Sequence, residues 1–166
     1  ATETDGVGRE RYTRFSREFL GATIDLDETY EWGKAELATI IAEQEAIAAE
    51  LYGPGTSVAE AMERLNNDPA RQLHSTAELR EWMQATADGA MEAISGTYFD
   101  VPDAMKTMEC MVLEDGTGVI YFTNLTDDFS RPGRMWWSVP AGVTDFVTWQ
   151  EKTTVFHEGV PGHHLQ

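Results

Sequence analysis

The last ten residues of the chain limit its fold most, because they cannot all lie on one regular helix. His157 and Glu158 begin this stretch, Pro161 and Gly162 follow, and two further histidines come directly after the glycine. Proline has no amide hydrogen, so Pro161 cannot bond to the carbonyl oxygen of His157, and its ring crowds that oxygen. The sequence therefore predicts a helix that is interrupted between Glu158 and Gly162.

The spacing of these histidines allows a shared metal ion only if the helix is interrupted. In the H-E-x-x-H pattern, two histidines four residues apart hold zinc and the glutamate acts as the general base. His163 and His164 come six and seven residues after His157. At about 100° and about 1.5 Å per residue, a straight helix would turn His163 to another face and set His164 about 10 Å away along the axis. Zinc–nitrogen bonds are about 2.0–2.1 Å, so neither spacing works on a straight helix.

Two interpretations of the interruption follow. A two-residue bulge between Glu158 and Gly162 would bring His163 to the position that the second ligand of the regular motif occupies. Alternatively, Pro161 and Gly162 end a helix and the histidines are exposed polar residues. The first interpretation predicts that the side chains of His157 and His163 converge and that Glu158 points at the same space.

The first part of the chain has the pattern of helices. Apolar residues at helical spacing predict a short helix from about Asp5 to Leu20 and a long one over residues 27–51, with Asp27 as its N-cap. Ser57 and Ser75 each precede a glutamate by three residues, which is the capping-box pattern at the start of a helix. We expect a short helix after Ser57 and a longer one after Ser75.

Beyond Gly96 the apolar residues alternate with a period of two. Residues 108–112 and 119–123 read as strands joined by a Gly-containing turn, which predicts a β-hairpin, and Met135–Val139 reads as a third short strand. Trp136 and Trp137 should then point to opposite faces, so that one can enter the core while the other lines a groove; the alternative is that both serve only the core. From Thr144 or Asp145 the pattern is helical again.

These elements predict an α+β fold that is mostly helical, with a small antiparallel sheet before the motif helix. The expected divisions are a helical region at 1–98, a small sheet and loop at 99–142, and the motif helix at 143–166. Because metal sites of this kind draw ligands from later elements, we expect the chain to be an incomplete domain of a longer protein.

Charge and composition exclude some classes of function. The net charge of −17, from 29 acidic and 12 basic residues, argues against nucleic acid as a partner. No apolar run reaches the roughly 20 residues of a membrane-spanning helix. Cys110 is the only cysteine and is expected to be a buried structural thiol; it allows a reducing compartment. The compartment stays open, with the cytoplasm slightly favoured.

Several short motifs are spread along nearly the whole chain: Gly8-Arg9-Glu10-Arg11-Tyr12, Phe19-Leu20-Gly21, Trp32-Gly33-Lys34-Ala35-Glu36-Leu37, Phe99-Asp100-Val101-Pro102, Ser130-Arg131-Pro132-Gly133 and His157-Glu158-Gly159-Val160-Pro161-Gly162-His163-His164-Leu165-Gln166. These motifs resemble those of the bacterial proteins called domain of unknown function 885. Those proteins are several hundred residues long, so the resemblance implies that this chain is an internal portion of one.

That family in turn resembles zincin metallopeptidases of the mostly helical group that includes thimet oligopeptidase and the Thermus-type carboxypeptidases. Their motif is H-E-x-G-H, and dipeptidyl peptidase III has one extra residue before its G-H; this chain would have two. The resemblance implies zinc as the cofactor, His157 and His163 as ligands, and Glu158 as the general base. It also implies a third ligand, a glutamate from the part of the parent chain after Gln166. The role of His164 stays open between support, substrate contact and replacement of His163.

The resemblance further implies a peptide substrate that adds to an edge strand near the metal. The strand Met135–Val139, with Trp136 and Trp137, is the expected edge, although the two strands of the hairpin compete for this role. Arg131 could meet a substrate carboxylate or form a structural ion pair. The predicted function is a zinc-dependent peptidase; the alternatives are a non-catalytic protein of zincin-like fold that binds peptide or metal, and a helical scaffold.

Overall fold

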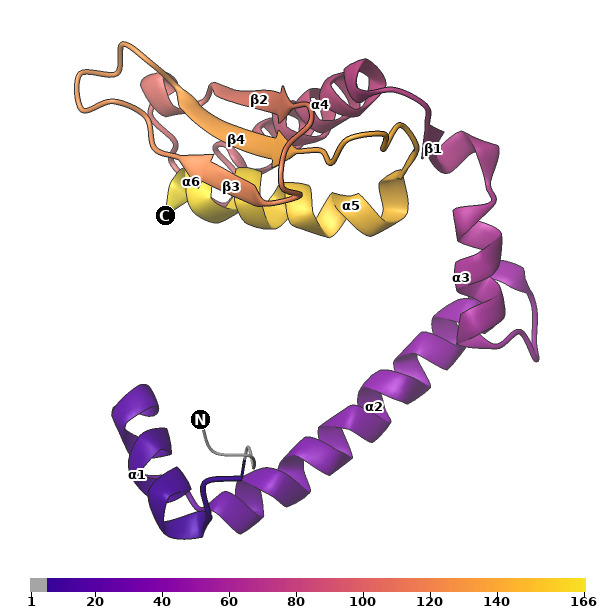
Figure 1. Cartoon of the computed structure of the whole chain (residues 1–166), viewed down its shortest axis with the longest axis vertical. Coiled ribbons are helices and arrows are strands. Elements are labelled where there is room, and N and C mark those ends of the chain that lie inside the picture. Colours follow the sequence, from indigo (N-terminus) through magenta and orange to yellow (C-terminus); the bar gives the residue numbers. More distant parts are fainter. Residues whose placement is uncertain (1–5) are drawn as a thin grey trace. The chain divides into compact units, whose positions relative to one another are not determined.

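The computed structural model describes residues 6–166 and separates the chain into two compact units, one ending at Ala61 and the other beginning at Met62. The chain is mostly helical with small sheets, which confirms the predicted α+β class (Figure 1). The second unit contains every strand and the histidine motif. The three-part division expected from the sequence stays a prediction.

The first unit holds α1 (Arg9–Leu20) and α2 (Leu26–Tyr52). Asp5, the predicted start of the first helix, lies outside the described residues. The N-cap of α2 is Asp25, whose carboxylate accepts hydrogen bonds from the amides of Asp27 and Glu28. The prediction of Asp27 as the cap was wrong, because Asp27 already lies in the first helical turn and binds the guanidinium of Arg9 at 2.7 and 2.8 Å.

The apolar residues expected on one face of α2 are exposed, among them Ile40, Ile47 and Leu51. Of the residues in α2, only Ala48 is buried against the part of the chain that the structure describes. Helix formation here therefore rests on helix propensity and the cap at its start, and the apolar face is left without a packing partner within the first unit, as far as the structure describes it.

The two predicted serine caps are confirmed. The hydroxyl oxygen of Ser57 accepts from the amide of Glu60 at the start of α3 (Val58–Asn66), and that of Ser75 accepts from Glu78 at the start of α4 (Thr76–Ile94). Along α4, a stripe of apolar residues repeats every four positions and is buried; it consists of Leu79, Met83, Ala87 and Met91.

The central sheet contains β2 (Met108–Leu113), β3 (Ile120–Thr123) and β4 (Gly133–Ser138) in the order β2-β4-β3. β4 runs parallel to β2 and antiparallel to β3. The predicted hairpin between the first two strands was therefore wrong, because β4 lies between them. β4 is the strand with the most buried residues, and the central position gives it a partner strand on both sides.

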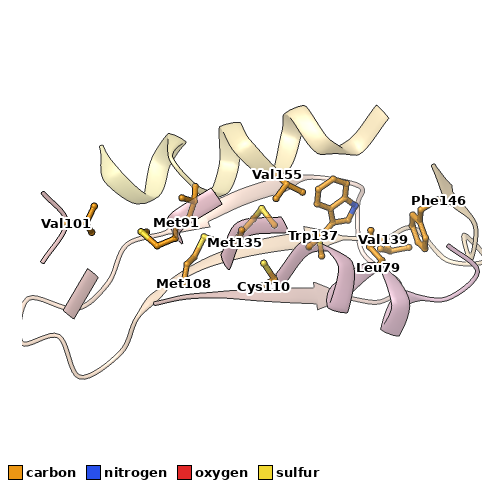
Figure 2. Packing of buried hydrophobic residues seen from close by; sticks show 13 residues of the cluster. Leu79, Met91, Val101, Met108, Cys110, Met135, Trp137, Val139, Phe146 and Val155 are labelled. Carbon is orange, nitrogen blue, oxygen red and sulfur yellow. The ribbon is translucent and has the colours of Figure 1, made fainter. Parts of the chain in front are cut away.

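The two tryptophans of β4 point to opposite faces of the sheet, as predicted. Trp137 is buried in the core, whereas Trp136 is half-buried on the other face, where it stacks against Tyr121. The helical segment that contains the histidine motif, residues 148–165, is called the motif segment. The core lies between one face of the central sheet on one side and α4 with the motif segment on the other. Figure 2 shows members of this core gathered there, among them Leu79 from α4, Cys110 from β2, Met135 and Trp137 from β4, and Val155 from the motif segment. Met83 of α4 and Val160 of the motif segment belong to the same cluster.

Two very short strands form a second, two-stranded sheet within the second unit. β1 (Gln72–Leu73) pairs antiparallel with β5 (Phe146–Val147). The last helical segment therefore begins at Thr148 and not at Thr144 or Asp145, because Phe146 and Val147 are held in the extended conformation by this pairing. One-turn 3₁₀ helices lie at Pro69–Arg71 (η1) and Asp103–Met105 (η2).

Within residues 6–166, no helix combines the length and the apolar character that crossing a membrane requires.

Candidate metal centre

The motif segment is an interrupted helix, as the proline predicted. α5 (Thr148–Thr154) continues into a π-helix over Val155–Gly159, and α6 (Gly162–Leu165) begins three residues later. Val160, between them, has an extended backbone, and the Val160–Pro161 peptide bond is cis. A π-helix bonds i to i+5 and so holds more residues per turn than an α-helix. This wider turn is how the chain accommodates the extra residues between the two halves of the motif.

Gly162 packs directly against the backbone of the π-helix. A Cβ atom at this position would lie 1.8 Å from the carbonyl oxygen of His157, so no side chain fits there. The start of α6 can therefore approach the turn that carries His157 and Glu158. As a result, the rings of His157 and His163 meet edge to face with their centroids 5.1 Å apart.

His157, Glu158 and His163, which we name the candidate centre, converge on one point. One carboxylate oxygen of Glu158 lies 3.9 Å from Nε2 of His157, and the other lies 3.8 Å from Nε2 of His163. One ligand atom from each of the three residues lies within 4.8 Å of the others. The side chain of Glu158 is 19% exposed, against 72% and 40% for the two histidines.

The donor set of the candidate centre fits a zinc ion. The imidazole nitrogens of His157 and His163 are typical zinc ligands, and the Glu158 carboxylate lies where it could act on a water beside the ion; tetrahedral bonds of 2.0–2.1 Å require about 3.3 Å between ligand atoms. The observed spread of up to 4.8 Å is wider by an amount that small side-chain rotations close. The same donors also suit other first-row transition metals, so the geometry supports a metal site without selecting the ion.

His164 points away from the candidate centre and into the core. It is 3% exposed, its Nε2 donates to the carbonyl oxygen of Met105 at 2.5 Å, and its ring meets that of Phe122 edge to face. The other nitrogen, Nδ1, is buried without a hydrogen-bond partner among residues 6–166 and lies over Gly133, where an added Cβ would be 2.8 Å away. Of the three roles left open for His164, the structure favours support, because the ring anchors α6 to β4 and η2.

A cavity of about 510 Å³ opens beside the candidate centre. One wall is the chain of β3 and the residue after it, and the other wall is the motif; the lining residues are Ile120, Tyr121, Phe122, Asn124, Glu158, His163 and Gln166. The larger cavity of about 970 Å³ lies among α1 and α2 in the first unit and contains none of the candidate centre. We therefore regard the smaller cavity as the one relevant to chemistry.

The edge strand beside the centre is β3, not the strand predicted for this role. Met135–Val139 falls largely in β4, which is hydrogen-bonded on both sides and has no free edge. Alternation of apolar residues marks both strands in the sequence, but it does not reveal which one lies at the edge. Sequence reasoning favoured β4 and also missed Asn124 and Gln166; the only signal for Gln166 is its position three residues after His163.

Other side chains predicted near the site lie elsewhere. Trp137 is in the core, and the indole nitrogen of Trp136 donates to the hydroxyl of Thr123 on the outer face of the sheet. The guanidinium of Arg131 donates to the carbonyl oxygens of Asn124 at 2.7 Å and Pro132 at 3.2 Å. None of the three lines the cavity beside the candidate centre. Arg131 has a structural role within its own loop, through backbone carbonyls instead of an ion pair.

Comparison with known proteins gives a family and one related fold. Residues 1–166 match the family described as "Bacterial protein of unknown function (DUF885)". A solved structure described as "the putative lipoprotein from Colwellia psychrerythraea" is similar with a TM-score of 0.62 and 24% identity. The match covers 94% of this chain and 28% of that protein, so the chain spans less than a third of its length. No curated protein matches the chain.

Proposed function

The chain belongs to this family of bacterial proteins of unknown function, and from that premise we propose that it carries the motif-bearing part of a zinc-dependent peptidase. One observation carries the proposal: the carboxylate of Glu158 lies within 4 Å of Nε2 of both His157 and His163, beside the edge strand β3. The resemblance of the motif to that of zincin peptidases supports the same assignment.

In this proposal, His157 and His163 bind the ion through their Nε2 atoms. A zinc ion, when bound, lowers the pKa of a coordinated water towards about 7 and polarises a carbonyl group. The two imidazoles leave positions for water and for a further protein ligand. A glutamate from another part of the longer protein is the ligand that the resemblance implies.

Glu158 is the proposed general base. It takes a proton from water as the water oxygen bonds to the scissile carbonyl carbon, and it passes a proton to the leaving nitrogen as the carbon–nitrogen bond breaks. The partial burial of its side chain limits exchange with bulk solvent, and its two oxygens face the two histidines. A water held between these groups therefore lies within reach of the base.

β3 is the proposed docking edge for the substrate. An extended peptide can add to a free strand edge through main-chain hydrogen bonds, and β3 ends the order β2-β4-β3. Ile120, Tyr121 and Phe122 of this strand line the cavity that also contains Glu158 and His163. A peptide bound along β3 would pass beside the general base.

The test uses the full-length protein, purified without added chelator. We expect about one zinc ion per chain by elemental analysis, hydrolysis of a peptide library, and loss of hydrolysis with retention of zinc in Glu158→Gln. Glu151→Gln is the matched control, because Glu151 lies on α5 in the same segment but outside the candidate centre. It should keep both zinc and activity.

Two results would count against the proposal in different ways. A wild-type protein that contains no zinc and gains none on addition would show that the assigned centre is not a zinc site. A protein that holds zinc but cleaves no peptide would instead support the alternative, a non-catalytic protein that binds metal or peptide through a zincin-like site.

A further inference from the structure

We infer that Gln166 is a positioning residue that fixes the tautomer of His163 so that its Nε2 is free to bind metal. This inference rests on the proposed metal centre and adds a residue to it. Neither the motif spacing nor the comparisons assign a role to Gln166.

The contact that carries the inference is a hydrogen bond of 2.8 Å between Nδ1 of His163 and the side-chain oxygen Oε1 of Gln166. A neutral imidazole has one N–H and one nitrogen lone pair. An amide oxygen only accepts, so this contact requires the hydrogen on Nδ1. The lone pair is then on Nε2, the atom that lies 3.8 Å from Glu158.

The local backbone explains why the contact forms. Gln166 follows His163 by three residues at the end of α6, and residues three apart lie on the same face of a helix. The side-chain amide of Gln166 can therefore reach Nδ1 of His163, on the edge of the ring that points away from the candidate centre. Gln166 also lines the cavity that contains Glu158 and His163.

The other two histidines of the motif differ from His163. His164 donates from Nε2 to Met105, which is the opposite tautomer, and its free nitrogen is enclosed over Gly133. The ring of His157 makes no hydrogen bond to any residue between 6 and 166. Its Nε2 lies 3.9 Å from a carboxylate oxygen of Glu158, which is too far for a hydrogen bond. His163 is therefore the one ligand of the candidate centre that the described residues hold ready for an ion.

Partners of this kind commonly change metal affinity by about 10- to 100-fold when they are removed. Glutamine can present either its oxygen or its nitrogen, and only the oxygen supports the required tautomer. Gln166→Glu keeps an acceptor and removes the donor, whereas Gln166→Leu keeps similar bulk and removes both. The pair of variants therefore separates an acceptor role from packing.

The direct measurement is the tautomer of each histidine ring by ¹⁵N NMR, in the metal-free full-length protein at a pH where the rings are neutral. We expect His163 to be in the Nδ1–H form in the wild type and in Gln166→Glu, and to become a mixture in Gln166→Leu. His157, in the same spectra, is the internal control and should not change between variants. Zinc titration against a chelator should give an affinity about 10- to 100-fold lower for Gln166→Leu, and close to the wild type for Gln166→Glu.

An Nε2–H or mixed tautomer for His163 in the wild type would overturn the inference, and so would equal losses of zinc affinity in both variants. If Gln166→Leu fails to fold, the wild-type spectrum and Gln166→Glu still decide the question. The tautomer is read without metal or substrate. A correct tautomer together with an absence of hydrolysis would therefore overturn the peptidase proposal alone.

Discussion

Replacing Gly162 with alanine tests whether close backbone packing creates the candidate centre. The added Cβ would lie 1.8 Å from the carbonyl oxygen of His157, 2.5 Å from its carbonyl carbon and 2.6 Å from the carbonyl oxygen of Phe156. Real Cβ atoms essentially never approach closer than 3.0 Å, so the gap must open by at least 3.0 − 1.8 = 1.2 Å. All three atoms belong to the backbone, so no side-chain rotation relieves the clash.

The movement must separate α6 from the π-helix and therefore His163 from His157. Metal–ligand distances tolerate deviations of about 0.2 Å, and a misplacement of about 1 Å in a catalytic group can cost about 100-fold in rate. We therefore expect zinc affinity to fall, because the two imidazoles can no longer keep their distances to the ion within that tolerance, and the rate of peptide hydrolysis to fall on the order of 100-fold. The free energy of unfolding of the metal-free protein should fall by about 1–3 kcal/mol, which is typical of overpacking.

Gly159→Ala is the matched control, because it makes the same change in the same motif. Its added Cβ would meet the methyl group of Met108 at 3.2 Å, and the end of a methionine side chain can move by the few tenths of an ångström required. Zinc titration of the full-length proteins against a chromophoric chelator, with urea unfolding in parallel, compares the two. If the zinc affinity of Gly162→Ala lies within about threefold of the wild-type affinity, the added Cβ has not moved His163 away from His157 by more than metal–ligand distances tolerate. The packing argument then fails.

Two further predictions concern the core. Gly133→Ala should lower the free energy of unfolding by about 1–3 kcal/mol in urea titration, because the new Cβ would lie 2.5 Å from the ring of Phe122 and 2.8 Å from Nδ1 of His164; an unchanged midpoint would show that these rings are not packed on β4. Burial raises the pKa of the Cys110 thiol to about 12, so at neutral pH the thiol stays protonated and should resist alkylation in the native protein but react fully in denaturant. Alkylation is followed by mass spectrometry. If Cys110 in the native protein reacts as fast as a free thiol, the thiol is not buried as the structure places it.

Short-range features of the fold were predictable because they depend on neighbouring residues. The caps at Ser57 and Ser75 need only a hydroxyl followed by free amides, and the opposite orientations of Trp136 and Trp137 follow from the geometry of any strand. The cap at Asp25 was missed by two residues, because both aspartates suit a helix start; in the structure the carboxylate of Asp25 accepts from the first free amides, whereas that of Asp27 binds Arg9.

The interruption of the motif helix was predictable from local sequence, since Pro161 lacks an amide hydrogen whatever surrounds it. His157 and His163 could also be named as candidate metal ligands from the motif alone, and that assignment stays a prediction. The position of β4 inside the sheet and of β3 at its edge could not be predicted in this way, because strand order depends on the burial of residues far apart in the chain. Packing also settled which of the two adjacent histidines faces Glu158. The ring of His164 packs on Gly133, and Gly162 packs on the backbone of His157, so that the ring of His163 lies beside Glu158. These contacts join residues far apart in the chain or depend on the exact path of the backbone, and neither can be read from residue spacing.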